Sequence, residues 1–290
     1  MSTTRMPAWL ELTRPVNVIA GGITCYLGGY MVGIDGATHI PLLFSCFSVM
    51  LLMAAGNIVN DVIDSAIDSR AHPYRPIPSG RVDRSIAKGM GIGFWIASML
   101  SMLIATRLLY QEEWLWWAAP AIWLLAASLM ATYDLGPRSK NRGILGNIAI
   151  SLMVGAVILF GAAAVGSIDS QLIWFVGLTA FFINLGREMV KDCEDMDADG
   201  GRQTMPMRVG RENTRMVAYL CALAGLVMSA IPYYIGLLDI QWLLLQAPAF
   251  ILILTCNKPL MTGDDRKAQR SLRIGLFFGL IGFVAASALS

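Results

Sequence analysis

Two groups of oxygen-rich side chains repeat one spacing in this chain. The first acidic stripe is Asn57, Asp61, Asp64 and Asp68, and the second, 131 positions later, is Glu188, Asp192, Asp195 and Asp199. On a helix each set falls within about 60° of one face and spans roughly 16 Å of the axis. Carboxylates about 6 Å apart repel by roughly 3 kcal/mol at an effective dielectric near 20. Mg²⁺ relieves such repulsion and shares its ligand shell between carboxylates and a substrate phosphate, so the spacing predicts Mg²⁺ sites.

The elements that must position these stripes are membrane helices. Of the 290 residues 56% are hydrophobic and 14% charged, and the mean hydropathy is +0.59. These values predict an all-α integral membrane protein rather than a soluble domain. At about 20 residues per span, the apolar runs predict nine transmembrane helices, at 15–34, 40–66, 85–107, 114–133, 144–164, 171–191, 214–236, 240–256 and 271–289.

The basic residues predict how these helices are oriented. Of the 22 lysines and arginines, Arg107 alone falls on the opposite side of the membrane from the others. The positive-inside rule therefore places the amino terminus and both stripes in the cytoplasm, in a multi-pass protein of the cell membrane. By the same rule, residues 258–273 are interpreted as a basic cytoplasmic loop. Residues 1–290 are expected to form one transmembrane domain, and the motifs at 57–68 and 188–199 suggest two related halves.

Polar residues near the stripes are candidate substrate contacts. Arg75 and Arg81 lie in a loop stiffened by three prolines, and guanidinium groups suit phosphate oxygens. Arg14 is interpreted either as an interface anchor or as a substrate contact. Amides inside a predicted span are costly without a partner. The predicted substrate-binding residues are Asn17, Asn57, Arg75, Arg81, Tyr133, Lys140, Asn147, Arg187, Glu188 and Lys191.

Metal-binding carboxylates, basic loops and an apolar interior suit a substrate with a diphosphate head and a hydrocarbon tail. Mg²⁺ would neutralise the departing diphosphate, and the helices would shield an allylic cation from water. The carboxylates then act as metal ligands, although one of them can also accept a proton from the acceptor. A transporter of divalent cations or phosphate is an alternative from another functional class. No nucleic-acid partner is expected.

The two motifs resemble those of a known enzyme family. The segment from Asn60 to Asp68 matches the NDxxDxxxD signature of the UbiA superfamily of intramembrane prenyltransferases, and Lys191 to Asp195 with Asp199 resembles its second aspartate motif. The resemblance implies a UbiA-like bundle of nine helices with a central cavity open to the cytoplasm. It also implies catalytic roles for Asp64, Asp68, Asp192 and Asp195, and Mg²⁺ binding by Asn60, Asp61, Asp64, Asp68, Asp192, Asp195 and Asp199.

Within the superfamily, the chain resembles the archaeal digeranylgeranylglyceryl phosphate synthases. The segments that carry this resemblance are 56–57, 75–79, 146–147, 160–161, 165–166 and 187–188. It implies Mg²⁺-dependent transfer of a geranylgeranyl group from geranylgeranyl diphosphate to the lipid-like acceptor geranylgeranylglyceryl phosphate in archaeal ether-lipid biosynthesis. Ala198, where a glycine is usual, and a shortened link from Asp199 to Thr204 depart from the pattern. An aromatic quinone precursor is the alternative acceptor.

A glyceryl phosphate acceptor would bring a second anion beside the donor diphosphate. Two such anions cannot share a dry cavity without added positive charge. The sequence offers four candidate cations for the acceptor phosphate, of which Lys140 and Arg75 are favoured. The set is Arg75, Arg81, Lys140 and Lys191.

Overall fold

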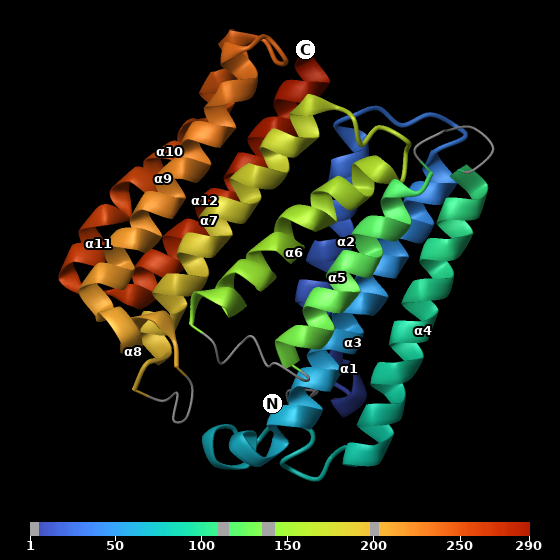
Figure 1. Ribbon diagram of the computed structural model, residues 1–290, viewed down its shortest axis with the longest axis vertical. Coiled ribbons are helices and arrows are strands. Elements are labelled where there is room, and N and C mark those ends of the chain that lie inside the picture. The colour runs from blue at the N-terminus through green and yellow to red at the C-terminus, as the bar shows by residue number, and fades with distance from the viewer. Residues whose placement is uncertain (1–5, 110–115, 135–142, 198–202) are drawn as a thin grey trace, which may run out of the picture.

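The structure is a computed structural model that describes residues 6–109, 116–134, 143–197 and 203–290. These residues form helices joined by turns (Figure 1). In chain order the elements are α1 (Ala8–Thr13), α2 (Pro15–Tyr30), α3 (His39–Ala71), α4 (Arg84–Leu109), α5 (Ala118–Asp134), α6 (Ile144–Ala163), α7 (Gln171–Asp195), α8 (Met205–Val209), α9 (Arg211–Tyr234), the 3₁₀ helix η2 (Ile240–Gln246), α10 (Ala247–Thr255), α11 (Asn257–Thr262) and α12 (Asp265–Leu289).

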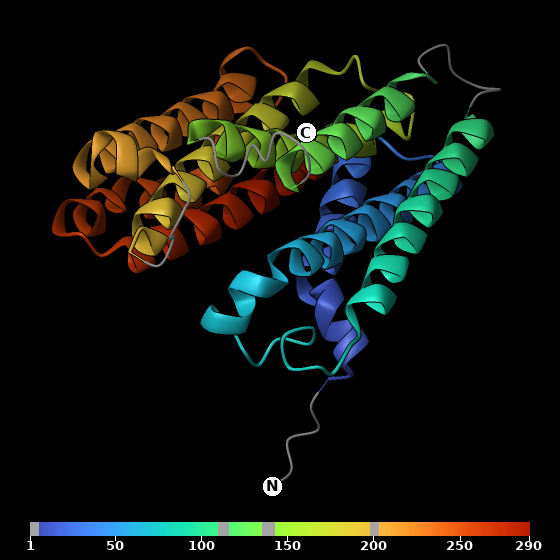
Figure 2. The same cartoon turned by 60° about the horizontal axis from the view of Figure 1, so that its bottom comes forward.

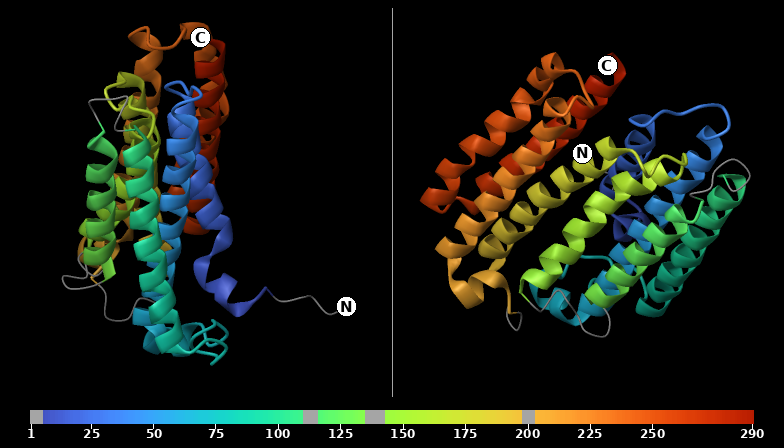
Figure 3. Two further views of the ribbon diagram at one scale, coloured as in Figure 1. Left: turned by 90° about the vertical axis from the view of Figure 1, so that its right-hand side faces the viewer. Right: turned by 45° about the horizontal axis from the view of Figure 1, so that its top comes forward.

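The long helices form one elongated bundle. In Figure 1, α9 to α12 form one flank, α3 and α4 form the other, and α6 and α7 lie between them. The turned views in Figures 2 and 3 show the same division. Helix α6 packs against α2 and α7, and these pack in turn against α3 and α9, so α6 links the two flanks.

Glycines allow the closest helix contacts. At Gly28 of α2 and Gly161 of α6 a side chain would collide with backbone atoms of the facing helix. Gly186 of α7 meets the backbone of α9 at Ala218 in the same way. Small residues bring membrane helices together in this manner because packing replaces the hydrophobic effect inside a bilayer. The α2–α6 and α7–α9 pairs are therefore backbone-to-backbone contacts.

Seven segments of the described chain are long and apolar enough to cross a membrane. Each of the nine predicted spans lies on a helical segment, but α2 has only 16 residues and the apolar part of α5 covers 118–133. The total of nine crossings therefore remains a prediction. The seven segments are His39–Ala66, Arg84–Leu109, Ile144–Ala163, Gln171–Asp195, Arg211–Tyr234, Ile240–Thr262 and Asp265–Leu289.

The helices bring both acidic stripes to the same end of the bundle. The carboxyl ends of α3 and α7 lie at the lower end in Figure 1, with the start of α6 between them. Helix α3 has 33 residues and is about 50 Å long, which exceeds the roughly 30 Å apolar core of a bilayer. Its last turns lie at the lower end of the left view in Figure 3, beside the start of α4. The described chain begins at this end and finishes at the opposite one.

Candidate functional site

The first acidic stripe is buried on α3 and bound by arginines. Asp61, Asp64 and Asp68 are 5%, 8% and 5% exposed. A guanidinium nitrogen of Arg14 lies 2.7 Å from Oδ1 of Asp61. One guanidinium nitrogen of Arg75 lies 2.6 Å from Oδ2 of Asp68 and 3.8 Å from Oδ1 of Asp61. Two positive charges from other segments therefore balance the first acidic stripe.

Arg14 reaches this position from the junction of α1 and α2. Its φ of 53° is the one positive φ at a non-glycine residue in the described chain. Such a conformation is costly for a residue with a Cβ and persists when surrounding contacts hold it. One such contact lies beside it, because the Asn57 side-chain amide donates to the Thr13 carbonyl at 2.8 Å. The junction is thus attached to α3 at two neighbouring points.

The first acidic stripe fits a divalent cation by its donor chemistry. Arg75 places positive charge between the carboxylates of Asp61 and Asp68, so a cation already occupies the position that the sequence assigned to a metal. Carboxylate oxygens are the ligands that Mg²⁺ prefers. Within the described ranges, however, no three acidic, histidine or cysteine side chains gather closely enough to form a ligand group. In this conformation Arg14 and Arg75 balance the negative charge of the first acidic stripe.

The second acidic stripe has different contacts. The side-chain amide of Asn147, at the start of α6, donates to Oδ2 of Asp192 at 2.8 Å. Glu188 is buried and pairs with the neighbouring Arg187. The Arg187 Nε also donates to Oδ1 of Asn184 at 3.1 Å. The structure thus brings the predicted substrate-binding residue Asn147 to the predicted metal ligand Asp192, and it pairs two others, Arg187 and Glu188, with each other on α7.

The remaining predicted site residues fall into three groups. Asn60, Asp64, Asp195 and Tyr133 each take part in a polar, aromatic or electrostatic interaction. Asn17 and Lys191 are exposed, so the structure does not place them in a closed site. Lys140 and Asp199 lie outside the described residues.

Arg81 belongs to a separate surface network in the loop after α3. Its guanidinium donates to Glu11 at 2.7 Å and to the Tyr74 carbonyl at 2.6 Å. The hydrogen bond to Glu11 raises the pKa of Arg81 above its ordinary value. Arg81 therefore braces α1 against this loop and does not contact the carboxylates of the first acidic stripe.

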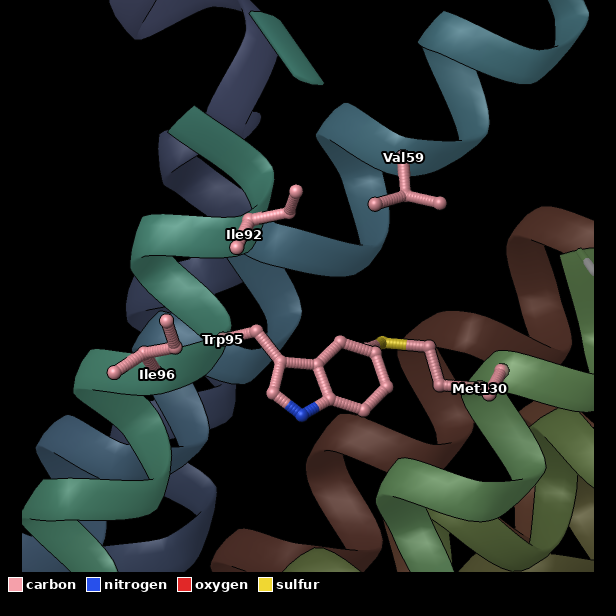
Figure 4. A pocket seen from close by; sticks show the side chains of 6 residues that line it. Val59, Ile92, Trp95, Ile96 and Met130 are labelled. Atoms are coloured by element: carbon pink, nitrogen blue, oxygen red, sulfur yellow. The ribbon is translucent and has the colours of Figure 1, made fainter. Parts of the chain in front are cut away.

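An apolar pocket of about 190 Å³ lies between α3, α4 and α5 (Figure 4). The Trp95 ring of α4 points across it toward Met130 of α5. The α3 wall is Val59, which lies about 200° around the helix from Asn57. The pocket is therefore on the face of α3 opposite the first acidic stripe and does not adjoin its carboxylates.

A second apolar space, which we call the lateral groove, lies between α2 and α12. Helices α6 and α7 form its back, and its volume is about 170 Å³. It is lined mainly by aliphatic and aromatic side chains, with Arg273 of α12 as a charged member. The sequence analysis placed Arg273 at the edge of a basic loop, but residues 265–273 form the first turns of α12.

Sequence reasoning did not resolve the roles of Arg14, at the first acidic stripe, and Arg273, in the lateral groove. For Arg14, the Arg-Pro pair at a helix start is a local signal, but its partner Asp61 lies 47 positions away. For Arg273, the signal is a charge that continues the apolar helix-face spacing of Leu276, Phe277 and Leu280.

The fold and the site describe a class of protein: a helical membrane protein with buried carboxylates at one end of the bundle and an apolar groove between α2 and α12. Comparisons with known proteins agree. The sequence profile of the UbiA prenyltransferase family matches residues 22–283. The digeranylgeranylglyceryl phosphate synthase of Methanopyrus kandleri is 33% identical over 97% of this chain and 99% of that protein.

Solved structures give the same result. A structure of digeranylgeranylglyceryl phosphate synthase in membranes has a TM-score of 0.79 and 25% identity, with 98% of each chain covered. A UbiA homologue from Archaeoglobus fulgidus bound to GPP and Mg²⁺ has a TM-score of 0.70 and 15% identity, with 97% of this chain and 98% of that chain covered, and shares the fold.

The chain belongs to the UbiA prenyltransferase family. It is therefore a multi-pass membrane enzyme that transfers prenyl groups. This membership confirms the resemblance found in the sequence and decides against the transporter alternative.

Proposed function

We propose that this enzyme transfers a geranylgeranyl group from geranylgeranyl diphosphate to the free hydroxyl of geranylgeranylglyceryl phosphate. The product is digeranylgeranylglyceryl phosphate, which carries the second ether bond of archaeal lipids. The observation that carries the proposal is the similarity to synthases of that name over nearly the whole of both chains. The acidic stripes supply the oxygen ligands that a diphosphate leaving group requires.

Bound Mg²⁺ would supply charge neutralisation for the departing diphosphate. Asn60, Asp61, Asp64 and Asp68 would hold it from α3, and Asp192, Asp195 and Asp199 from the second acidic stripe. Asn147 orients the Asp192 carboxylate by donating to one of its oxygens. Arg14 and Arg75 hold positive charge beside the same carboxylates and would turn toward the diphosphate when a metal takes their place.

The apolar helices then protect the reacting carbon. An allylic cation that forms as the diphosphate leaves reacts with any water present, so the interior must stay dry. A carboxylate of either stripe can accept the proton that the acceptor hydroxyl loses when its oxygen bonds to the prenyl carbon. In this proposal residues 1–290 act as one catalytic domain. The acidic end faces the cytoplasm, in agreement with the distribution of arginine and lysine.

The test is product analysis by mass spectrometry. Purified enzyme receives geranylgeranyl diphosphate and Mg²⁺ with either geranylgeranylglyceryl phosphate or an aromatic acid as acceptor. We expect the diether phosphate as the main product and no product after Mg²⁺ is chelated. A preference for the aromatic acid would overturn the acceptor assignment while leaving prenyl transfer intact.

A further inference from the structure

The lateral groove has the form of a trough rather than a closed pocket. Its volume of about 170 Å³ is below the roughly 300–1,000 Å³ of sites that enclose a small ligand. Phe277 on its edge is 61% exposed. A long hydrocarbon chain lying in this groove would therefore remain partly in the surrounding lipid.

Arg273 gives the groove a single charged group. Among the described residues that line it, no other is ionisable, and Arg273 makes no hydrogen bond or ion pair with the described part of the chain. The hydroxyls of Thr24 and Thr179 each donate at 2.8 Å to a carbonyl of their own helix. Arg273 is exposed, about two turns from the start of α12, so its unpaired guanidinium is accessible to an anionic ligand at the groove.

The position of Arg273 along α12 gives the groove a direction, with one cationic end and one apolar end. The start of α12 packs near the carboxyl end of α7, because Ala268 and Leu272 share a core cluster with Met189 and Val190. The Arg215 guanidinium of α9 also binds both oxygens of Asp265 at 2.7 and 2.6 Å. Arg273 lies eight residues into the helix, about 12 Å from Asp265 along the axis, and Phe283 lies about 15 Å farther. The cationic end of the groove thus points toward the acidic stripes and the apolar end points away.

We propose that Arg273 binds the phosphate of the acceptor lipid while the prenyl chain of that lipid lies along the lateral groove. This inference rests on the proposed function. A lipid with one phosphate at its head and a branched hydrocarbon tail matches both the charge and the direction of the groove. The donor diphosphate would bind at the acidic stripes, so the two anions would meet separate cations.

In this structure protein carboxylates bind both arginines of the loop after α3, and the proposed function assigns Arg75 to the donor diphosphate. Arg75 binds Asp68, and Arg81 binds Glu11. Arg273 has no such competitor among the described residues. It therefore determines specificity for a phosphorylated acceptor over the same lipid without its phosphate.

The experiment compares Arg273→Gln with Arg270→Gln, an exposed arginine one turn earlier on α12 that does not line the groove. Both variants are placed in nanodiscs of zwitterionic lipid. We expect Arg273→Gln to raise the KM for geranylgeranylglyceryl phosphate on the order of ten- to a hundredfold, without changing the KM for geranylgeranyl diphosphate. Arg270→Gln should match the wild type, and Arg273→Lys should fall between the two.

A second pair of variants separates the groove from general folding. Leu280→Trp narrows the lateral groove, whereas Ile96→Trp adds the same bulk to the pocket between α3, α4 and α5. The first should raise the acceptor KM and the second should not. Equilibrium binding of the acceptor, measured by intrinsic fluorescence without donor or Mg²⁺, should weaken in Arg273→Gln by the same factor as its KM rises.

The outcomes separate this inference from the proposed function. If the wild type does not prenylate geranylgeranylglyceryl phosphate, both are wrong. If it does and Arg273→Gln keeps the wild-type KM and acceptor binding, the role of Arg273 alone is wrong. A loss that affects donor and acceptor equally, or that appears only in nanodiscs of anionic lipid, would also overturn it, because Arg273 would then support the fold or bind bulk lipid.

Discussion

The two acidic stripes share one spacing but have different environments. On α3, Asp61 and Asp68 bind arginines from the α1–α2 junction and from the loop after α3. On α7, Asp192 accepts a hydrogen bond from a neutral amide of α6, and Glu188 pairs with an arginine of its own helix. The first acidic stripe is thus held by long-range ion pairs, and the second by a neighbouring helix.

This difference shows that spacing along a helix does not determine charge balance. Both helices present carboxylates on one face, yet the neighbours of that face decide whether the described partners come from distant segments or from a packed helix. Around α3 the neighbours are a short helix and a loop, which can supply arginines and also move. Around α7 the neighbour is the first turn of a packed helix. We therefore expect the α3 side to rearrange when a metal binds and the α7 side to stay in place.

The largest expected effect is loss of activity when either stripe loses a carboxylate. Asp64→Ala and Asp192→Ala should each lower turnover by about 10² or more at saturating Mg²⁺, because each removes an oxygen ligand near the leaving diphosphate. Asp169→Ala, at an exposed position outside both stripes, should keep normal turnover. The measurement is product formation by extracted, monodisperse protein. Near-normal turnover in either stripe variant would show that the stripes do not act together.

The next effect tests the cation that balances the first acidic stripe. Arg75→Gln leaves the buried Asp68 without its ion pair and should lower the free energy of unfolding by about 1–3 kcal/mol. Mg²⁺ should restore part of this loss, since it neutralises the same carboxylates. The measurement is the Tm in detergent with and without Mg²⁺. An equal Mg²⁺-induced shift in variant and wild type would contradict the idea that Arg75 holds the position of a metal.

The second acidic stripe should respond through substrate binding rather than stability. Asn147→Ala removes the donor to Asp192 and should raise the KM for geranylgeranyl diphosphate about tenfold, since a hydrogen bond to a charged group contributes about 1.5–3 kcal/mol. Asn213→Ala is the matched control, because its exposed amide donates to the Val209 carbonyl at the end of α8 and not to a carboxylate. If Asn147→Ala instead lowers the Tm in a Mg²⁺-dependent way, the two stripes are balanced alike.

The smallest effect is expected for Arg81, which lies with Arg75 in the loop after α3 but binds Glu11, a carboxylate outside the stripes. Arg81→Gln breaks the surface pair with Glu11 and should leave Tm and its Mg²⁺ dependence unchanged, because surface ion pairs contribute little. The measurement is the Tm of Arg81→Gln and Arg75→Gln by differential scanning fluorimetry, with and without Mg²⁺. A similar loss in both variants would mean that the loop as a whole, not the buried contact with Asp68, stabilises this end of the bundle.

The helices were predictable from the sequence because bilayer thickness and hydropathy determine where apolar runs occur. The residues at which the helices end could not be predicted in this way. The predicted spans 40–66, 171–191 and 271–289 became α3 (His39–Ala71), α7 (Gln171–Asp195) and α12 (Asp265–Leu289). Hydropathy stops at the first charges, whereas the helix continues through them by its own backbone hydrogen bonds. The same cause assigned residues 265–270 to a loop alone, although they form the first turns of α12.

The site was predictable to the extent that it lies along single helices. The spacing of the carboxylates identified both stripes, and a lone amide at a helix start identified Asn147. The partners of Asp61 and Asp68 come from segments that reach α3 through tertiary packing. Local spacing carries no information about such contacts, so Arg14 stayed undecided between two roles.

The glycine contact between α2 and α6 has a mechanical consequence. Because the backbones of these helices touch at Gly28 and Gly161, they form a stiff wall on one side of the lateral groove. The opposite wall, α12, is pinned at its first turn by the Arg215–Asp265 pair. The far part of α12 is held as well, because the Gln246 side chain donates to the Gly279 carbonyl at 3.2 Å and the Phe283 ring is buried against Tyr233. Both walls of the lateral groove are therefore fixed along their length, and its width should change little when a hydrocarbon chain enters.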